Sequence, residues 1–167
     1  MATPIDLIDG APDGWREPTH DERAVFTVPD PRDLQRRTIL DPRARFFLTK
    51  DPRWDHPFGS PALAGRDCLW WVLERDDVTV DWRLLSDDKL AAHVRARLSE
   101  AGHREVDKEA GALIAMYVNR SGRISHFARR SHIEGCWVSK VGTYGNVLLH
   151  DLHAFTADYG VPAVFFA

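Results

Sequence analysis

Apolar residues recur at helical spacing in the segment SDDKLAAHVRARLSEAGH, residues 86–103, where Leu90, Val94 and Leu98 stand four positions apart. This spacing places them on one face of a helix, so the pattern predicts an amphipathic helix. Ser86 is the expected N-cap, and two aspartates follow it in the first turn, where the helix dipole favours negative charge. Gly102 is the expected stop.

Beyond residue 110 the pattern is typical of strands. The segment ALIAMYVNRSGRISHFARRS predicts a hairpin, with an apolar strand at 112–118, a turn at 119–122 and a second strand through Ile124 and Phe127. GCWVSKVG predicts a third strand, NVLLHDLHAF a strand end running into a helical turn, and VPAVFFA a closing strand inside the sheet. Residues 66–75 predict a short buried helix. Helices followed by an antiparallel sheet indicate the α+β class.

The first 60 residues differ in character because they are dense in proline. Proline favours turns and extended segments, so we expect little regular structure there beyond a short helix at 34–40. This segment nevertheless carries many large apolar side chains, which a disordered tail would not hold. We therefore predict one domain, in which an ordered arm (residues 1–60) wraps a core (residues 61–167). The aromatic residues of the arm are Trp15, Phe26, Phe46, Phe47, Trp54 and Phe58.

Composition narrows the functional classes. The chain has 167 residues and a net charge of −3, which argues against a nucleic acid or an anionic membrane surface as partner. No apolar run is long enough to span a membrane, and the acidic N-terminus does not resemble a signal peptide, so we expect a cytoplasmic protein. Cys68 and Cys136 are too few for a disulfide framework, and no Cys-x-x-Cys pair indicates zinc.

Cys68, in the segment GRDCLWWVL, is the first candidate for chemistry. A thiolate is the nucleophilic form, and a helix N-terminus together with a nearby histidine would favour it. The alternative is that Cys68 packs as a small hydrophobe among the tryptophans that follow it. Cys136 begins a strand with no base at useful spacing, and we interpret it as structural.

His126 is the candidate base, because it lies on a strand of the sheet that follows the cysteine helix. This order resembles the papain-like fold in its circularly permuted, NlpC-type form. That resemblance implies an antiparallel sheet with helices packed on it, a cysteine at the start of a helix, and a histidine on a neighbouring strand. It further implies a third polar residue on the next strand that orients the imidazole.

A closer likeness covers roughly residues 66–166 and is to an uncharacterised family of small bacterial proteins. That family's upstream cysteine corresponds to Cys68, although here it follows Asp67 where relatives usually have Asn. The negative charge at Asp67 either raises the thiol pKa or is neutralised by Arg66. The other matching positions are His126, Arg129, Trp137, Ser139, Lys140, Gly142, His150, Asp151, Tyr159 and Gly160.

The resemblance suggests roles for further residues. Ser139 is the first candidate to orient the His126 imidazole, and His150 is the second. Arg129 and Lys140 are candidate ligands for a substrate carboxylate. Trp71 and Trp137 are expected either in the core or along a substrate cleft.

Two other types of site are not supported by the sequence. His132, His150 and His153 do not have the spacing that puts two metal ligands on one helical face, and no glycine-rich phosphate loop is present. We therefore expect neither a metal nor a cofactor.

The leading hypothesis is a cysteine hydrolase or acyltransferase that acts on an amide, ester or thioester of a peptide or acyl substrate. In it Cys68 is the nucleophile, its backbone N–H is an oxyanion donor, and His126 is the general base and acid. The alternative is an inactive papain-like module that binds a protein partner, such as an adaptor or immunity protein.

Overall fold

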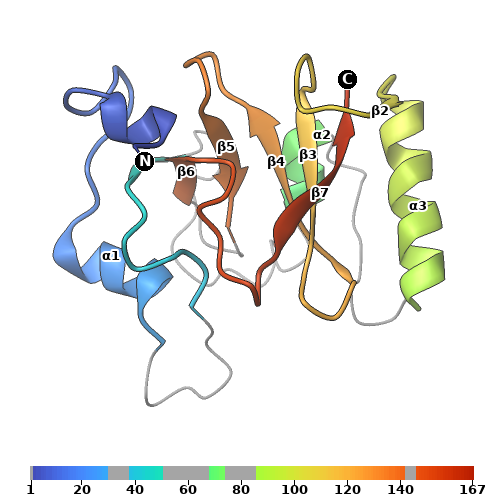
Figure 1. Ribbon diagram of the computed structural model, residues 1–167, viewed down its shortest axis with the longest axis horizontal. Helices are drawn as coiled ribbons and strands as arrows, with labels where there is room; N and C mark the ends of the chain where they lie inside the picture. The colour runs from blue at the N-terminus through green and yellow to red at the C-terminus, as the bar shows by residue number, and fades with distance from the viewer. Residues whose placement is uncertain (1, 30–37, 51–67, 74–85, 142–145) are drawn as a thin grey trace.

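The computed structural model describes residues 2–29, 38–50, 68–73, 86–141 and 146–167, which form a seven-stranded antiparallel sheet with helices around it (Figure 1). This arrangement confirms the α+β class. The helical elements are η1 (Pro4–Leu7), α1 (His20–Thr27), α2 (Cys68–Leu73) and α3 (Asp87–Glu100). The strands are β1 (Phe46–Lys50), β2 (Glu105–Val106), β3 (Ile114–Val118), β4 (Ile124–Arg130), β5 (Trp137–Lys140), β6 (Asn146–His150) and β7 (Val161–Phe166).

The strand order is β1-β6-β5-β4-β3-β7-β2. The predicted hairpin is present as β3 and β4, and the three strands expected after it are β5, β6 and β7. Two strands were not predicted. The arm contributes β1, which pairs with β6, and the two-residue strand β2 pairs with the end of β7. Because β2 is so short, Val161 at the start of β7 is 59% exposed although the strand lies inside the sheet order.

One face of the sheet is covered by α2 and α3, and we call it the helix face. α2 packs on β4 and β5, and α3 packs on β4. The predicted amphipathic helix is confirmed, since Leu90, Val94 and Leu98 of α3 are buried in one cluster. Ser86 is its N-cap by position but makes no capping hydrogen bond with its side chain. Cys136 is buried in the same cluster.

The opposite face is covered by α1 and residues 38–48 of the arm and by residues 151–160, which connect β6 to β7, whereas Ile5 of η1 packs in the cluster of the helix face. We call the opposite face the arm face and the connecting residues the cover segment. Its cluster joins Phe26 of α1 and Phe46 of β1 to Tyr117, Trp137 and other buried side chains of the sheet. Figure 1 shows α1 on the opposite side of the picture from α3, with α2 behind the sheet at β3 and β4.

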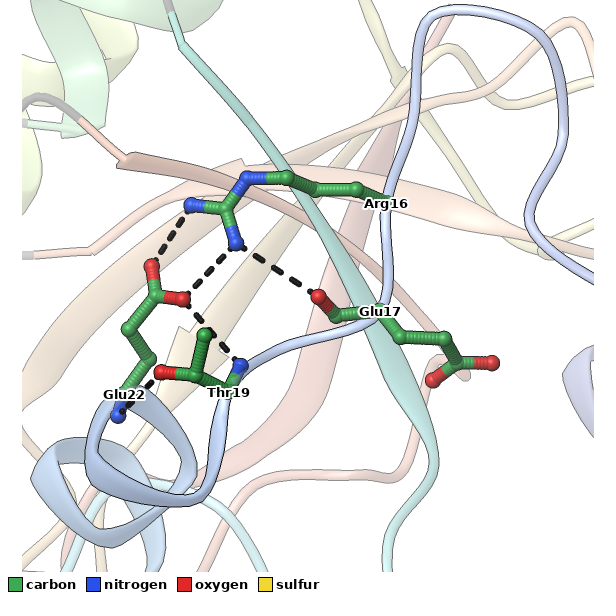
Figure 2. A network of polar contacts seen from close by, with 4 residues as sticks. All are labelled: Arg16, Glu17, Thr19 and Glu22. Atoms are coloured by element: carbon green, nitrogen blue, oxygen red, sulfur yellow. Dashed lines mark hydrogen bonds and ion pairs between the residues drawn. The ribbon is translucent and has the colours of Figure 1, made fainter.

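The arm contains a helix that the proline-rich composition did not predict. Thr19 caps α1, because its side chain accepts a hydrogen bond from the Glu22 backbone while the Glu22 carboxylate accepts one from the Thr19 backbone. Arg16 then binds both oxygens of the Glu22 carboxylate, at 2.6 and 2.7 Å (Figure 2). This Thr-x-x-Glu pattern is a capping box, and it was the available sequence signal for the helix. Most of the helix expected at 34–40 lies outside the described residues.

The cover segment lies close to the sheet because Gly160 permits it. Gly160 has a φ of +117°, a conformation that side chains disfavour, and a Cβ there would lie 2.5 Å from the Val118 carbonyl oxygen. Ser125, an extra residue in β4 opposite a register shift in β3, donates a hydrogen bond from its hydroxyl to the Tyr159 carbonyl. The turn at Gly160 and this bulge together hold the cover segment against β3 and β4.

Among the helices in the described part of the chain, none has the length and apolar character needed to cross a membrane.

Candidate functional site

Cys68 is the first residue of α2 and belongs to the helix face. It is 8% exposed and lies in the cluster that contains Met116 of β3 and Phe127 of β4. The residues immediately before it, including Asp67, lie outside the described residues.

His126 belongs to the arm face. It is opposite Tyr117 in the β3–β4 register, and its ring is fully buried. The ring centroid lies 5.4 Å from that of Tyr117, 4.8 Å from that of Phe155 and 4.7 Å from that of Tyr159. Neither ring nitrogen has a hydrogen-bond partner among the described residues. The imidazole is therefore enclosed by three aromatic rings.

The structure does not bring Cys68 and His126 together. Successive residues of a strand point to opposite faces, so His126 and Phe127 lie on different sides of β4. Phe127 packs in the cluster of Cys68, whereas His126 stacks on rings of the other cluster. The expected contact between the thiol and this imidazole is thus corrected. The sequence order placed a cysteine helix and a histidine strand next to each other, but not on the same face.

Ser139 and His150 do come together, although with each other rather than with His126. Their strands β5 and β6 are neighbours, and the Ser139 Oγ lies 2.7 Å from the His150 Nε2. The His150 Nδ1 lies 2.8 Å from the Asp151 carbonyl oxygen, which can only accept a hydrogen bond. Nδ1 therefore carries the proton, and Ser139 donates its hydroxyl proton to Nε2. The expectation that one of these residues orients the His126 imidazole is corrected by this pairing.

The two buried histidines are both held neutral. Burial lowers the pKa of His126 well below its ordinary value, and the nearby His150 lowers it further. Burial also lowers the pKa of His150 to about 4, against the opposing influence of Asp151 and its backbone carbonyl. Both imidazoles contact Phe155 with ring centroids 4.8 Å apart, so this one residue of the cover segment packs against both.

The Ser139–His150 pair resembles a nucleophile and its base in distance, but its surroundings are those of a structural pair. Ser139 and His150 are both fully buried, and Ser139 lies in the middle of a strand rather than at its end. Phe46 of the arm lies directly opposite His150 in the β1–β6 register. A carbonyl substrate has no approach to the hydroxyl while the arm is in place.

The candidate substrate ligands are distributed over both faces. Trp137 is fully buried on the arm face, with the Arg130 guanidinium 4.8 Å from its ring centroid, so it does not line a cleft with Cys68. Arg129 lies opposite Val138 in the β4–β5 register and is partly exposed. Lys140 is fully buried at the end of β5. The Trp71 side chain lies outside the described residues.

Three aromatic residues of this face, Tyr117, Phe155 and Tyr159, were not predicted as partners of the histidine. Tyr117 is fixed by a hydrogen bond of 2.8 Å from its hydroxyl to the Leu152 carbonyl, which ties the cover segment to β3. Alternation in the predicted hairpin would have put Tyr117 and His126 on one face. No sequence signal placed Phe155 beside them. Among the described residues, no group of three or more His, Cys, Asp or Glu side chains could hold a metal ion.

Comparison with known proteins gives one match. Residues 60–167 match the family model described as a domain of unknown function, DUF7689. No curated protein and no solved structure matches the chain. The match begins beyond the last residue of β1, so the described part of the arm lies outside it.

Proposed function

We propose that this chain, which belongs to the DUF7689 family, is a binding module for a protein partner rather than a hydrolase that uses Cys68 and His126. It would be a papain-like scaffold that has kept a cysteine helix on an antiparallel sheet but does not bring Cys68 to His126. It would act in the cytoplasm, where its two buried cysteines, Cys68 and Cys136, would stay reduced.

The observation that carries this proposal is the separation of the two candidate catalytic residues. A general base must lie within about 2.6–3.2 Å of the proton it takes, or reach it through one water. Cys68 packs with Met116 and Phe127, while the His126 ring lies among rings on the far side of the sheet. Bringing the two together would require β4 to turn over within a paired sheet.

The protonation of the imidazoles supports the same proposal. A base or acid works best when its pKa lies near the working pH. Burial lowers the pKa values of His126 and His150, so both stay neutral at pH 7. Neither is open to solvent, so neither has a route for the proton that an acyl-transfer step must receive and return.

A second candidate is the cysteine-dependent hydrolase or acyltransferase, with a base other than His126. It is favoured by the position of Cys68, which begins a helix packed on an antiparallel sheet and keeps 8% of its surface exposed. A dipole at the start of a helix lowers a thiol pKa by itself.

Thiol alkylation separates the two candidates. In a Cys136→Ala background only Cys68 reacts, and its rate with iodoacetamide is measured over about pH 6 to 10. We expect the same rate profile with His126 present and with His126→Phe, because the imidazole does not contact the thiol. His150→Phe is the matched control, since it removes the other buried imidazole of the arm face.

The proposal fails if His126→Phe lowers the alkylation rate at neutral pH at least about tenfold while His150→Phe does not. Such a result would mean that His126 holds the thiolate. Alkylation that is slow in every variant supports the binding module, because a nucleophile for substrate must also be reachable by a small reagent.

A further inference from the structure

The arm completes the sheet as an added strand. β1 pairs with β6 in antiparallel register from Phe46 opposite His150 to Lys50 opposite Asn146. Its other edge bonds to the arm itself, because the backbones of Arg16 and Leu48 exchange two hydrogen bonds of 2.9 and 2.8 Å. Phe46, Phe47 and Leu48 have no exposed surface at all. The backbone of this part of the arm therefore pairs with the sheet as a strand, and its side chains pack in the clusters of both faces.

Residues 38–41 of the arm bind the cover segment in the same extended manner. Thr156 donates its backbone N–H to the Ile39 carbonyl at 3.0 Å and its hydroxyl to the Thr38 carbonyl at 2.8 Å. Asp41 donates its backbone N–H to the Ala154 carbonyl at 2.9 Å. Leu40, fully buried, forms a bridge with Phe155, the residue that packs against both buried histidines. The arm therefore holds the cover segment over the polar residues of the arm face.

The family match covers the sheet side of this arrangement but not the arm. It spans residues 60–167 and includes β6 and the cover segment, but not β1 or residues 38–41. Without the arm, the edge of β6 has unpaired backbone groups, and the arm face loses Phe46 and Leu48. A β6 edge of this kind accepts an extended peptide, as in recognition by strand addition.

We propose that the β6 edge and the adjoining cover segment form a strand-acceptor site, which residues 38–50 fill as an internal ligand. The ligand from a partner protein would be an extended segment with three consecutive large apolar residues. Two of its side chains would enter the arm face in the places of Phe46 and Leu48, and the middle one would enter the helix face in the place of Phe47. This proposal names the partner of the binding module above and rests on it.

The tethered arm sets the affinity that a partner must exceed in order to displace it. A tethered segment competes at an effective concentration of about 1 mM, so a free peptide with the same contacts displaces little of it at micromolar concentration. A partner must therefore make better contacts than the arm, or act after the arm has been cut from the core. Displacement of Phe46 would also uncover the Ser139–His150 pair, since Phe46 lies opposite His150.

The experiment uses the full chain with a specific protease sequence inserted after residue 55, so that one cut separates the arm from the core without removing it. A fluorescent peptide of residues 38–50 is the probe, and anisotropy measures its uptake before and after the cut. A second peptide keeps Phe46, Phe47 and Leu48 but has serine or threonine at the other positions. The matched control peptide carries Phe46→Asp and Leu48→Asp.

We expect the cut protein to exchange its arm for either of the first two peptides. It should take up neither the control peptide nor a scrambled form of the 38–50 peptide at equal concentration. Uptake by the uncut protein should be at least about tenfold weaker, because the tether is intact. The proposal is overturned if the cut arm never exchanges, if the cut protein aggregates, or if the control peptide binds equally well. It is also overturned if the cut chains only exchange arms in dimers. None of these readouts involves Cys68, so a fall in Cys68 alkylation on His126→Phe would refute the proposed function and leave this result standing.

Discussion

The two faces of the sheet are both buried but are built differently. The cluster of the helix face is apolar, with leucines and a valine of α3, Met116, Phe127 and the two cysteines, and the fully buried Lys140 lies at the end of β5 on the same side. The arm face holds three buried polar side chains, His126, Ser139 and His150, beneath the cover segment. The difference teaches that the two buried histidines and the serine bonded to one of them are gathered on the face that the arm and the cover segment close. The helix that carries the candidate nucleophile covers the other face.

Within the arm face, the two histidines form a natural contrast. Both are fully buried and both pack against Phe155. Both ring nitrogens of His150 have partners, whereas those of His126 have none among the described residues. A buried polar group without a partner costs about 1–3 kcal/mol, and a paired one recovers most of that cost. The cost of burying the same side chain is therefore largely offset at position 150 and not offset at position 126.

Acid should affect the two faces very differently, and this is the largest effect we expect. Both histidines have pKa values below the ordinary 6.5 in the folded state, and that of His150 is about 4. The unfolded chain then binds more protons than the folded one between pH 6.5 and the folded pKa values. Stability is complete above pH 6.5 and falls as the pH drops, by up to about 1.4 kcal/mol per pH unit for each histidine.

Free energies of unfolding in urea at several pH values between 7 and 4.5 measure this slope. His126→Phe and His150→Phe should each remove about half of it, since each removes one group. Leu90→Met on α3 is the control, because it alters a buried residue of the helix face without removing a titratable group, and it should leave the slope unchanged. A slope that both phenylalanine variants leave intact would contradict the assignment of acid sensitivity to the arm face.

The same two variants should differ at neutral pH, which sharpens the contrast between the histidines. His126→Phe removes two buried nitrogens without partners, so we expect it to be neutral or to stabilise the fold by about 1 kcal/mol. His150→Phe leaves the Ser139 hydroxyl and the Asp151 carbonyl without their partner, so we expect a loss of about 1–3 kcal/mol. Chemical denaturation at pH 8, where both imidazoles are neutral, measures both values.

Ser139→Ala provides the control for this contrast. It removes only the hydroxyl that bonds to Nε2, and it should cost less than His150→Phe. Equal losses in His126→Phe and His150→Phe would mean that crowding by the larger ring decides the outcome and that the hydrogen bonds do not.

Much of the fold could be predicted from the sequence, because local patterns determine it. The helical spacing of Leu90, Val94 and Leu98 and the turn at Asn119–Gly122 are local signals, and α3 and the β3–β4 hairpin follow them. β1 could not be predicted in this way. Its residues FFLTK follow prolines and do not alternate, because the strand is buried in the clusters of both faces, and its partner strand β6 lies about 100 residues further along the chain.

The site was less predictable because it depends on which face each side chain occupies. The alternation of side chains along the strands is enough to predict that His126 and Tyr117 share one face of the sheet and that Phe127 lies on the other. However, only the packing of α2 against β4 and β5 shows that Cys68 lies on the side of Phe127. The Ser139–His150 pair depends on the β5–β6 register, in which Trp137 lies opposite His150 and Ser139 opposite Leu148. A shift of one residue would have turned Ser139 to the opposite face.

The smallest effect we expect is at the surface of the arm, where charge is paired in water rather than buried. The Arg16 guanidinium beside Glu22 lowers the pKa of that carboxyl to about 2, so the pair contributes above the ordinary pKa near 4.5 and is lost as the pH falls towards 2. The Arg16 side chain is 52% exposed, however, and solvent screens most of this energy.

Arg16→Gln should therefore cost less than about 1 kcal/mol at pH 7, whereas Thr19→Ala, which removes the N-cap of α1, should cost about 1 kcal/mol. Urea denaturation of the two variants compares them directly. A loss from Arg16→Gln that exceeds the loss from Thr19→Ala would mean that the arm is held by its charges. The strand-acceptor site would then bind its ligand less through the apolar residues of β1 than the burial of Phe46 and Leu48 indicates.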